Sequence, residues 1–388
     1  MTETRLRIGF IPLCDAAALL VAVDKGFADA EGLDIELIRE VSWSNVRDKL
    51  NIGLFDAAHL LAPVAIASSL GLGHVKVPIV APFGLGVNGN AITISPQLHA
   101  EIIEAADSNV LDPLVTARAL ARIVAERKRG GAEPLTFGMT FPFSTHNYQL
   151  RFWMAAGGID PDEDVRLVVL PPPYMVESLT SRQVDAFCVG APWNSVAVDL
   201  GVGSILHFSC EILAHAAEKV LAVRARWAEE NPDVLARLVR AHQRAADFIE
   251  DVSNRAEVTA ILAAPNRIGV DAEVISRTLE GRLKVAPDGS VRTDDRYLLV
   301  GRSGAARPDP VQAAWLYAQM VRWGQTPLSK ELLAAAKAVF RPDLFDAIVQ
   351  SGEAITTTPP DGIGAFAGPA FDAEDITSHL NSWAIKHR

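Results

Sequence analysis

Cysteine, runs of positive charge and long apolar stretches are all scarce in this sequence. Only three of the 388 residues are cysteines (Cys14, Cys188 and Cys210), and each lies in or beside an apolar run without a CxxC pair. That spacing excludes the disulfide framework of small secreted proteins, and it favours buried thiols over reactive ones. No apolar stretch reaches the length that a membrane span requires. We therefore expect a protein that makes no contact with a membrane.

Basic residues are outnumbered, with 36 Lys and Arg against 47 Asp and Glu and a formal net charge of -11. The resulting field repels polyanions, and no Lys/Arg run is present to overcome it. We therefore expect no direct contact with nucleic acid. The chain runs from Met1 straight into a strand-like segment, without the apolar core and cleavage site of an export signal. Taking Met1 as the native start, we expect a cytoplasmic protein.

Motifs for catalysis and cofactor binding are missing. The sequence has no GxSxG, HExxH or GKS/T segment, and its cysteines and histidines are not spaced as metal ligands. Four histidines, His59, His74, His207 and His215, lie on different expected elements. We therefore expect no metal, no cofactor and no enzymatic activity, and we interpret the chain as a binding protein.

What the sequence does contain is an alternation of strand-like and helix-like segments, which predicts an α/β fold with parallel sheets flanked by helices. The expected strands are 6–13, 33–38, 55–60, 76–82, 135–140, 165–170 and 186–190. The expected helices are 16–29, 44–52, 62–72, 112–129, 145–156 and 175–182. Beyond these, the chain is largely helical, over 227–250, 255–263, 271–282, 309–324 and 329–349, and a Pro/Gly-rich stretch at 358–364 precedes a last helix.

A short signature occurs twice. Residues 47–57 and 176–186 both run from a helix through a turn to Asp-Ala and an apolar strand. The repetition favours two lobes of like topology. We expect residues 1–93 and 197–388 to form a discontinuous first lobe that includes the C-terminal helices, and residues 94–196 to form the second.

Trp43 stands between two serines at the corner between an expected strand and an expected helix. Ligands of open α/β sheets bind at the carboxyl ends of strands, where helix N-termini present free N–H groups and partial positive charge. The indole adds one N–H donor, and a neighbouring serine can cap the helix. Together these groups suit a small anion, although packing of Trp43 in the corner explains the pattern equally well.

Four further positions come into consideration with it. The stretch 84–91 brings glycines and two amide donors, Asn88 and Asn90, and the alternative is a plain turn. The stretch 140–148 brings helix-capping residues and His146, which alone is more typical of a helix end. The stretch 189–194 brings Trp193 behind a proline, and core packing is an equal alternative. Lys219, at the head of an apolar strand, could neutralise a monovalent anion, whereas most lysines have no such role.

In this order the segments resemble the nitrate- and bicarbonate-binding proteins of ABC importers, and more closely their leaderless relative, the cytoplasmic nitrate/nitrite sensor of the NasS type. The matching segments, all within residues 6–250, are IGFIPL (8–13), SW (42–43), RDKL (47–50), DAAH (56–59), NGNAI (88–92), TFP (140–142), AAGGIDP (155–161), PPP (171–173), DAFCVGAPWN (185–194) and EKVL (218–221).

The resemblance implies a two-lobed periplasmic-binding-protein fold of type II that closes on its ligand. It places Trp43, Asn88 and Lys219 among the anion contacts, and it implies a ligand site completed by Gly89, Met139, Thr140, His146, Asn147, Gly190, Pro192 and Trp193. We expect these corners to meet in a dry, cationic notch. Two positions depart from the family, because Met139 replaces a ligand histidine and Asn88 replaces a glutamine. His146 could compensate for the lost histidine.

The resemblance also implies a function. Nitrate or nitrite would hold the closed form through its higher affinity for that form, and the partner would be a NasT-type response regulator that binds leader RNA as an antiterminator. Two alternatives stay open. One is the substrate-binding component of a nitrate/bicarbonate-type ABC importer. The other is an enzyme like the thiamine-pyrimidine synthases, which share this fold but use a cysteine-rich motif.

Overall fold

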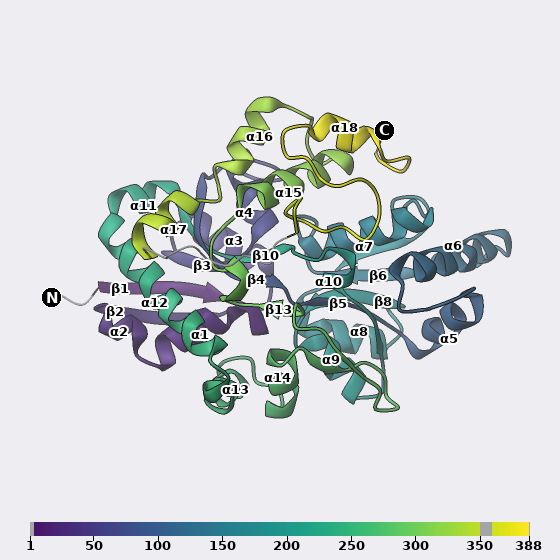
Figure 1. Cartoon of the computed structure of the whole chain (residues 1–388), viewed down its shortest axis with the longest axis horizontal. Helices are drawn as coiled ribbons and strands as arrows, with labels where there is room; N and C mark the ends of the chain where they lie inside the picture. Colours follow the sequence, from purple (N-terminus) through teal and green to yellow (C-terminus); the bar gives the residue numbers. More distant parts are fainter. Residues whose placement is uncertain (1–3, 350–358, 388) are drawn as a thin grey trace.

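The computed structural model describes residues 4–349 and 359–387, and most of its strands form two separate sheets, each flanked by helices (Figure 1). Met1, on which the expectation about export depends, and Thr358 of the Pro/Gly-rich stretch lie outside the described residues. The first sheet has the order β13-β4-β10-β3-β1-β2. Its strands are β1 (Thr4–Phe10), β2 (Leu33–Arg39), β3 (Ala57–Leu61), β4 (Ile79–Asn88), β10 (Ala217–Arg224) and β13 (Leu298–Leu299).

The second sheet has the order β7-β6-β8-β5-β9, and β11 (Arg282–Lys284) pairs with β12 (Val291–Thr293) in a separate two-stranded sheet. The strands of the second sheet are β5 (Asn90–Ile94), β6 (Thr136–Met139), β7 (Arg166–Val169), β8 (Ala186–Gly190) and β9 (Ser204–Phe208). Its helices are α5 (Pro96–Ala105), α6 (Pro113–Arg129), α7 (Thr145–Gly157), α8 (Met175–Thr180), α9 (Trp193–Asp199) and α10 (Ser209–Ile212).

The two sheets share one topology. Read from one edge, β2-β1-β3-β10-β4 corresponds to β7-β6-β8-β5-β9. In each, the first three strands are parallel, and the fourth runs antiparallel to both of its neighbours. The expectation of parallel sheets was therefore wrong in this detail, and both sheets are mixed. The fourth strand of each sheet, β10 or β5, is the one that the chain forms directly after it crosses from the other sheet. It therefore enters in the opposite direction.

The repeated Asp-Ala signature has the same structural role in both sheets. Asp56 precedes β3, donates its backbone N–H to the carbonyl of Arg7 on β1, and accepts the N–H of Arg7 on its carboxylate at 2.8 Å. Asp185 precedes β8 and makes the same two bonds with Thr136 on β6. In each case the aspartate fixes the start of an inner strand against its neighbour.

The chain crosses between the sheets at Gly89 and again between β9 and β10. β5 and β9 both pair in the second sheet. Residues 90–93 and 204–208 therefore lie in the second sheet, although the expected lobe boundaries, after residue 93 and before residue 197, put them in the first lobe. β4 also runs further than the expected strand 76–82 and includes most of the expected loop 84–91. Its glycines allow close packing, because a Cβ at Gly84 would lie 2.2 Å from the carbonyl oxygen of Ala305.

Helices cover both faces of the first sheet, and β10 shows how the faces differ. Val220 and Ala222 pack in the core that contains α3 and α4, whereas Leu221 and Val223 pack in the core that contains α1 and α12. This is the alternation of a strand buried on both sides. The helices on this side of the molecule are α1 (Ala17–Asp24), α2 (Phe27–Ala30), α3 (Trp43–Asn51), α4 (Ala62–Leu70), α11 (Ala225–Glu230), α12 (Pro232–Glu250), α13 (Arg255–Ala263) and α14 (Ala272–Leu279).

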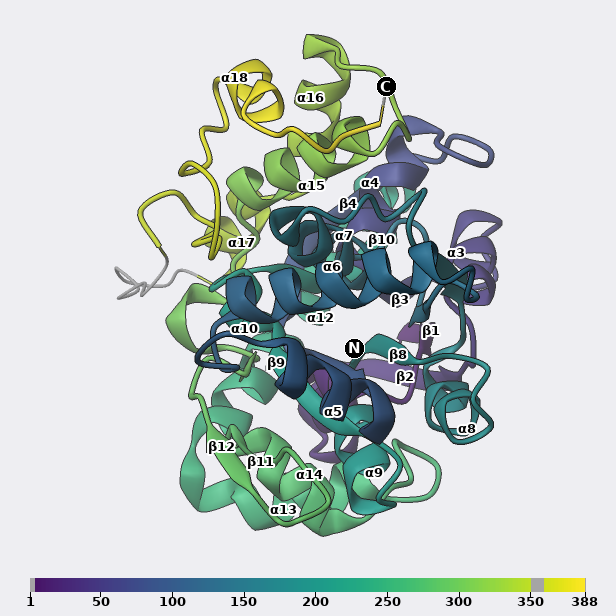
Figure 2. The same cartoon turned by 90° about the vertical axis from the view of Figure 1, so that its right-hand side faces the viewer.

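Prolines divide two of the expected helices. The expected helix 227–250 is split before Pro232 into α11 and α12, and the expected helix 329–349 is split before Pro342, since proline starts a helix but cannot continue one. The remaining helices, α15 (Pro310–Arg322), α16 (Lys330–Lys337), α17 (Pro342–Val349) and α18 (Ile376–Asn381), follow the sheets in the chain. Of these, α15, α16 and α18 lie at the top of Figures 1 and 2.

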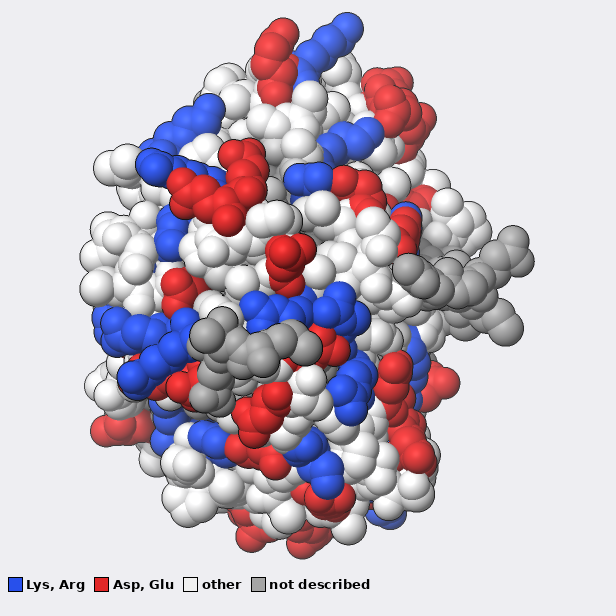
Figure 3. Space-filling model, turned by 90° about the vertical axis from the view of Figure 1, so that its left-hand side faces the viewer, with Lys and Arg blue, Asp and Glu red and all other residues white. Residues whose placement is uncertain are grey.

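The surface beside the β1–β2 edge carries charges of both signs, with Lys and Arg interspersed among Asp and Glu (Figure 3). Arg5, for example, pairs with Glu36 at 3.2 Å. This face therefore offers no continuous basic track. Among residues 4–349 and 359–387, the structure has no helix whose length and apolar character would let it span a bilayer.

Candidate functional site

Lys219 lies on β10 in the interior of the molecule, where the two sheets come together. Its ammonium Nζ is 2.9 Å from the carboxylate of Asp15 and 2.8 Å from that of Glu218. All three side chains are buried. Glu218 precedes Lys219 in the same strand, and the pairing of β10 with β4 shifts register on both sides of Lys219. Such a bulge lets two consecutive side chains reach the same ion pair, although regular alternation would separate them.

Two histidines extend this group. His59 on β3 is hydrogen-bonded through Nε2 to Asp15 at 2.9 Å. His146 on α7 lies with Nδ1 3.2 Å from Glu218. Asp15 is thus bonded to a strand of the first sheet, and Glu218 contacts α7, a helix that flanks the second sheet. We call Asp15, His59, His146, Glu218 and Lys219 the buried charge cluster.

Burial and pairing shift the pKa values within the buried charge cluster in different directions. Burial opposes ionisation of Asp15, but Lys219 and His59 outweigh it and lower the pKa of Asp15 to about 2. Burial raises the pKa of Glu218, and Lys219 offsets only part of that effect. Burial also lowers the pKa of His59 and, reinforced by Lys219, lowers that of His146 well below its usual range. Near neutral pH these shifts favour the charged forms of Asp15 and Lys219 and the neutral forms of both histidines.

Trp43 stands beside the buried charge cluster. The Lys219 ammonium lies 5.3 Å from the centre of the indole, and the His59 ring packs edge-on at 5.4 Å. Trp43 is the first residue of α3, and Ser42 caps that helix by accepting the N–H of Asn45. The expected strand–helix corner is therefore present, and the structure brings Trp43 and Lys219 together.

An amide pair closes another side of the site. Asn90 on β5 donates to Glu218 at 2.8 Å and to the side-chain oxygen of Gln149 at 3.1 Å. The thiol of Cys188 lies 3.9 Å from the same Gln149 oxygen. Asn90 thus holds the Glu218 carboxylate from the second-sheet side, and Gln149 holds the Asn90 amide.

Three buried nitrogens of the site have no hydrogen-bond partner among the described residues. They are Trp43 Nε1, His146 Nε2 and Gln149 Nε2. A buried N–H without an acceptor costs stability, so native proteins supply a partner in nearly every case. The Trp43 indole and the Gln149 amide are donors, and His146 Nε2 is one when the neutral ring carries its hydrogen there. Donors around a buried ammonium are suited to a small oxyanion. Among residues 4–349 and 359–387, no group of three or more His, Cys, Asp or Glu side chains is arranged so that it could hold a metal ion.

Other expected ligand residues are occupied by bonds within the protein. The Asn88 amide donates to the carbonyls of Ala214 and Arg296, and its oxygen accepts the N–H of Ala216. Asn88 also has a positive φ of 62°, and it shapes the crossing between the sheets together with Gly89. Asn88 is therefore placed as a structural residue, and Asn90 takes the position near the ion pairs.

The residues at the start of α7 are also occupied by hydrogen bonds within the protein. Asn147 donates to the carbonyl of Pro142 and accepts from Arg151. Ser144 caps α7, and Thr145 donates to the carbonyl of Ala217. Only His146 of this stretch retains a nitrogen without a partner.

Of the remaining expected residues, Thr140 and Gly190 lie against the site. Thr140 Oγ1 is 3.0 Å from His146 Nδ1, and a Cβ at Gly190 would lie 3.5 Å from both Asp15 and Asn90. Met139 ends β6 and packs in the core. Pro192 precedes α9. Trp193 packs against two groups of buried apolar side chains, and its indole N–H has no partner among the described residues.

The sequence-based expectation did not include Asp15, Glu218, His59 or Gln149, and it named Asn90 as a possible donor without placing it among the ligand residues. The rule of strand carboxyl ends could have found Asp15, which follows β1, and Asn90 lies inside a stretch that was considered. Glu218 was hidden by the bulge in β10. The expected cationic notch is also wrong as stated, because the single ammonium is matched by two carboxylates.

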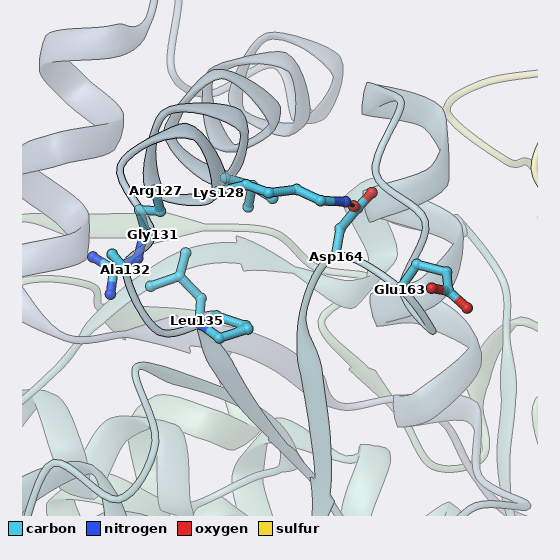
Figure 4. Close-up of a pocket in the computed structure, with 9 residues that line it drawn as sticks. Arg127, Lys128, Gly131, Ala132, Leu135, Glu163 and Asp164 are labelled. Atoms are coloured by element: carbon cyan, nitrogen blue, oxygen red, sulfur yellow. Dashed lines mark hydrogen bonds and ion pairs between the residues drawn. The ribbon is translucent and has the colours of Figure 1, made fainter.

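A surface hollow of about 180 Å³ lies apart from these residues, at the C-terminal end of α6 (Figure 4). Lys128 reaches across it to Asp164 at 2.8 Å. That hollow contains an exposed ion pair and none of the unpartnered donors.

Comparison with known proteins places the chain in a family. A profile described as the NMT1-like family matches residues 1–263. The chain belongs to the NMT1-like family. Its relatives include the nitrate/nitrite binding protein NrtA of Synechococcus elongatus, 31% identical over 391 residues that cover 98% of this chain and 86% of that protein. The bicarbonate transport ATP-binding protein CmpC of the same species is 32% identical over all of this chain, which spans 56% of its length.

Solved structures confirm the fold. The periplasmic nitrate-binding protein NrtA from Synechocystis PCC 6803 superposes with a TM-score of 0.88 at 27% identity, over 98% of this chain and 99% of that one. An alkanesulfonate-binding protein, SsuA from Xanthomonas axonopodis, shares the fold alone, with a TM-score of 0.58 at 17% identity. The NMT1-like chain is thus an α/β periplasmic-binding-protein fold of type II. The two NrtA proteins and SsuA are named as binding proteins, which agrees with the expectation of binding without turnover.

Proposed function

We propose that the protein binds nitrate or nitrite at the buried charge cluster, between its two sheets. The observation that carries this proposal is the Trp43 indole beside the Lys219 ammonium, with an N–H that no described residue accepts. His146 Nε2 and Gln149 Nε2 supply two further positions for hydrogen bonds. The relatives named as nitrate/nitrite binding proteins, which match over nearly the whole chain, support the same ligand.

Geometry favours a small planar anion. Lys219 is a compact point charge, whereas a bidentate clamp would use Arg. The groups around it come from β10, α3 and α7, so that one ligand could contact both halves of the molecule. A ligand held in this way stabilises the closed arrangement, because it can contact both sides only when they are together.

Titration calorimetry with nitrate, nitrite, bicarbonate, chloride and an alkanesulfonate tests the proposal. We expect saturable binding of nitrate or nitrite, and a loss of about 1–3 kcal/mol of binding free energy in Trp43→Phe, which keeps the ring but removes the N–H. Trp227→Phe, far along the chain on α11, is the matched control. Absence of heat with both nitrogen oxyanions would rule the proposal out.

We further propose that this binding serves a cytoplasmic sensor, which controls a NasT-type RNA-binding antiterminator of nitrate assimilation genes. The similarity of the segments named above to the NasS-type sensor supports it. The net charge of -11 also supports it, since the RNA contact then belongs to the partner. Co-purification with the regulator encoded nearby, with and without nitrate, is the test, and we expect nitrate to release the regulator.

The alternative role is that of a substrate-binding component of an ABC importer. It is favoured by the relatives that are named as import and transport proteins. Stimulation of a cognate permease–ATPase by the nitrate-loaded protein, together with no capture of the regulator, would establish the importer role instead.

A further inference from the structure

Glu218 shares the Lys219 ammonium with Asp15. An anion bound at Lys219 would therefore have to approach the Glu218 carboxylate. The groups that face it come from every element packed around it: Lys219 on β10, Asp15 on η1 (Cys14–Ala16), His59 on β3, Asn90 on β5, Cys188 on β8, and His146 and Gln149 on α7.

The charges of this group do not favour an anion as they stand. Asp15 is held ionised by Lys219 and His59, and these contacts use the ammonium and one imidazole. If Glu218 is ionised too, two carboxylates face one ammonium, and the buried charge cluster has a net negative charge. A proton on Glu218 cancels that charge, and burial favours the protonated form.

The same proton decides which nitrogen of His146 carries hydrogen. Glu218 and Thr140 both contact Nδ1, at 3.2 Å and 3.0 Å. An ionised Glu218 accepts a hydrogen bond from Nδ1–H, which leaves Nε2 as a lone pair that repels an anion. A protonated Glu218 donates its O–H to Nδ1, so the neutral ring bears its hydrogen on Nε2. The Thr140 hydroxyl can donate or accept and fits both states.

Nε2 is the buried atom of His146 that has no partner among the described residues. With hydrogen on it, Nε2 becomes a donor like the Trp43 indole. One proton therefore removes the repelling charge and also creates a hydrogen-bond donor. These two effects act in the same direction on anion affinity.

We infer that the site takes up one proton with each anion, and that Glu218 holds this proton and thereby sets the tautomer of His146. The inference rests on the proposed function, since it needs a bound anion. Glu218 is a positioning residue in this scheme, because it acts on the ligand through His146 and through its charge. The anion remains ionised, and no covalent bond is made or broken.

Nitrate titrations between about pH 6 and pH 9 test the inference, because nitrate itself does not titrate there. For the wild type we expect the affinity to fall about tenfold per pH unit once the pH exceeds the folded-state pKa of Glu218. At a pH above that pKa, where the ligand-free site lacks the proton, calorimetry in buffers of different ionisation enthalpy should count one proton taken up per anion. Glu218→Gln imitates the neutral acid, so its affinity should be independent of pH and at least about tenfold tighter at the alkaline end.

Glu104→Gln, on the exposed face of α5, is the matched control and should keep the wild-type pH profile. The proton count needs only the wild type, so the inference stays testable if Glu218→Gln does not fold. Nitrate binding with a pH-independent affinity and no proton uptake would overturn the inference and leave the proposed function intact. No nitrate or nitrite binding at any pH would overturn both.

Discussion

At the scale of the residue, the central finding is that Lys219 is not a free cation. Its ammonium is shared between Asp15 and Glu218 in a fully buried setting. Asp15 and Glu218 raise the pKa of Lys219 against the opposing effect of burial. Buried ions of this kind are tolerated only while each is paired. The residue that was expected to serve the ligand therefore also stabilises the closed fold.

Lys219→Glu should accordingly destabilise the protein severely. The substitution would place three carboxylates together in the interior and leave no cation to pair with them. We expect a loss of more than about 3 kcal/mol in the free energy of unfolding, measured by urea denaturation. Lys76→Glu, at an exposed position, is the control and should have little effect. A wild-type unfolding midpoint for Lys219→Glu would show that the ion pairs do not form.

Asn88→Ala separates a structural role from ligand binding. The change removes three hydrogen bonds to backbone groups and places alanine at a φ of 62°. We expect a loss of about 2–4 kcal/mol of stability, measured by denaturation, with unchanged nitrate affinity in the folded protein. The reverse result, weaker binding at unchanged stability, would return Asn88 to the ligand site.

At the scale of the element, the site depends on strand ends and on one irregularity in β10. A strand–helix corner at Trp43 and the head of an apolar strand at Lys219 are visible in the sequence, but only the family resemblance selected these two residues as anion contacts. Glu218 could not be predicted, because alternation along a regular strand places neighbours of Lys219 on the other face. Asn88 was favoured over Asn90 for a related reason, since the turn between β4 and β5 decides which amide points inward.

The packing of β4 against η1 sets the position of Asp15. Gly86 pairs with Lys219 across the strands, and a Cβ there would lie 2.8 Å from the Cβ of Asp15. We expect Gly86→Ala to displace Asp15, to cost about 1–3 kcal/mol of stability and to weaken nitrate binding in calorimetry. Gly130→Ala at the end of α6, where the nearest atom would be 3.4 Å away, is the control. Unchanged affinity in Gly86→Ala would mean that Asp15 does not position Lys219 for the ligand.

At the scale of the whole molecule, the two halves repeat one arrangement. The βαβ rhythm and the repeated Asp-Ala signature were sufficient to predict an α/β fold with two lobes of like topology. The antiparallel strands β5 and β10 were not predictable in the same way, because each pairs in a sheet with strands that lie far away in the sequence. A strand that pairs with residues so far away in the sequence leaves no local signal of its direction in the hydrophobic periodicity.

The whole molecule also has a definite response to acid. Burial lowers the pKa of His59, His146, His207 and His242, and that of His242 falls to about 4 from a usual 6.5. Between those values the unfolded chain binds more protons than the native state, so stability falls as the pH falls. For His242 the loss amounts to about 3 kcal/mol by pH 4.

His242→Leu should remove the part of the stability loss at low pH that His242 causes. We expect the difference in unfolding free energy between about pH 7 and pH 4 to shrink by about 3 kcal/mol, measured by denaturant unfolding at each pH. A slope identical to that of the wild type would show that His242 titrates alike in the native and unfolded states.

The structure of the protein crystallised with nitrate tests the central claim most directly. The account predicts one anion among Trp43, His146 and Lys219, with the indole N–H and the imidazole Nε2 both within hydrogen-bond distance of its oxygens. An anion bound elsewhere, or these donors left without contact to it in the nitrate-saturated crystal, would contradict the account.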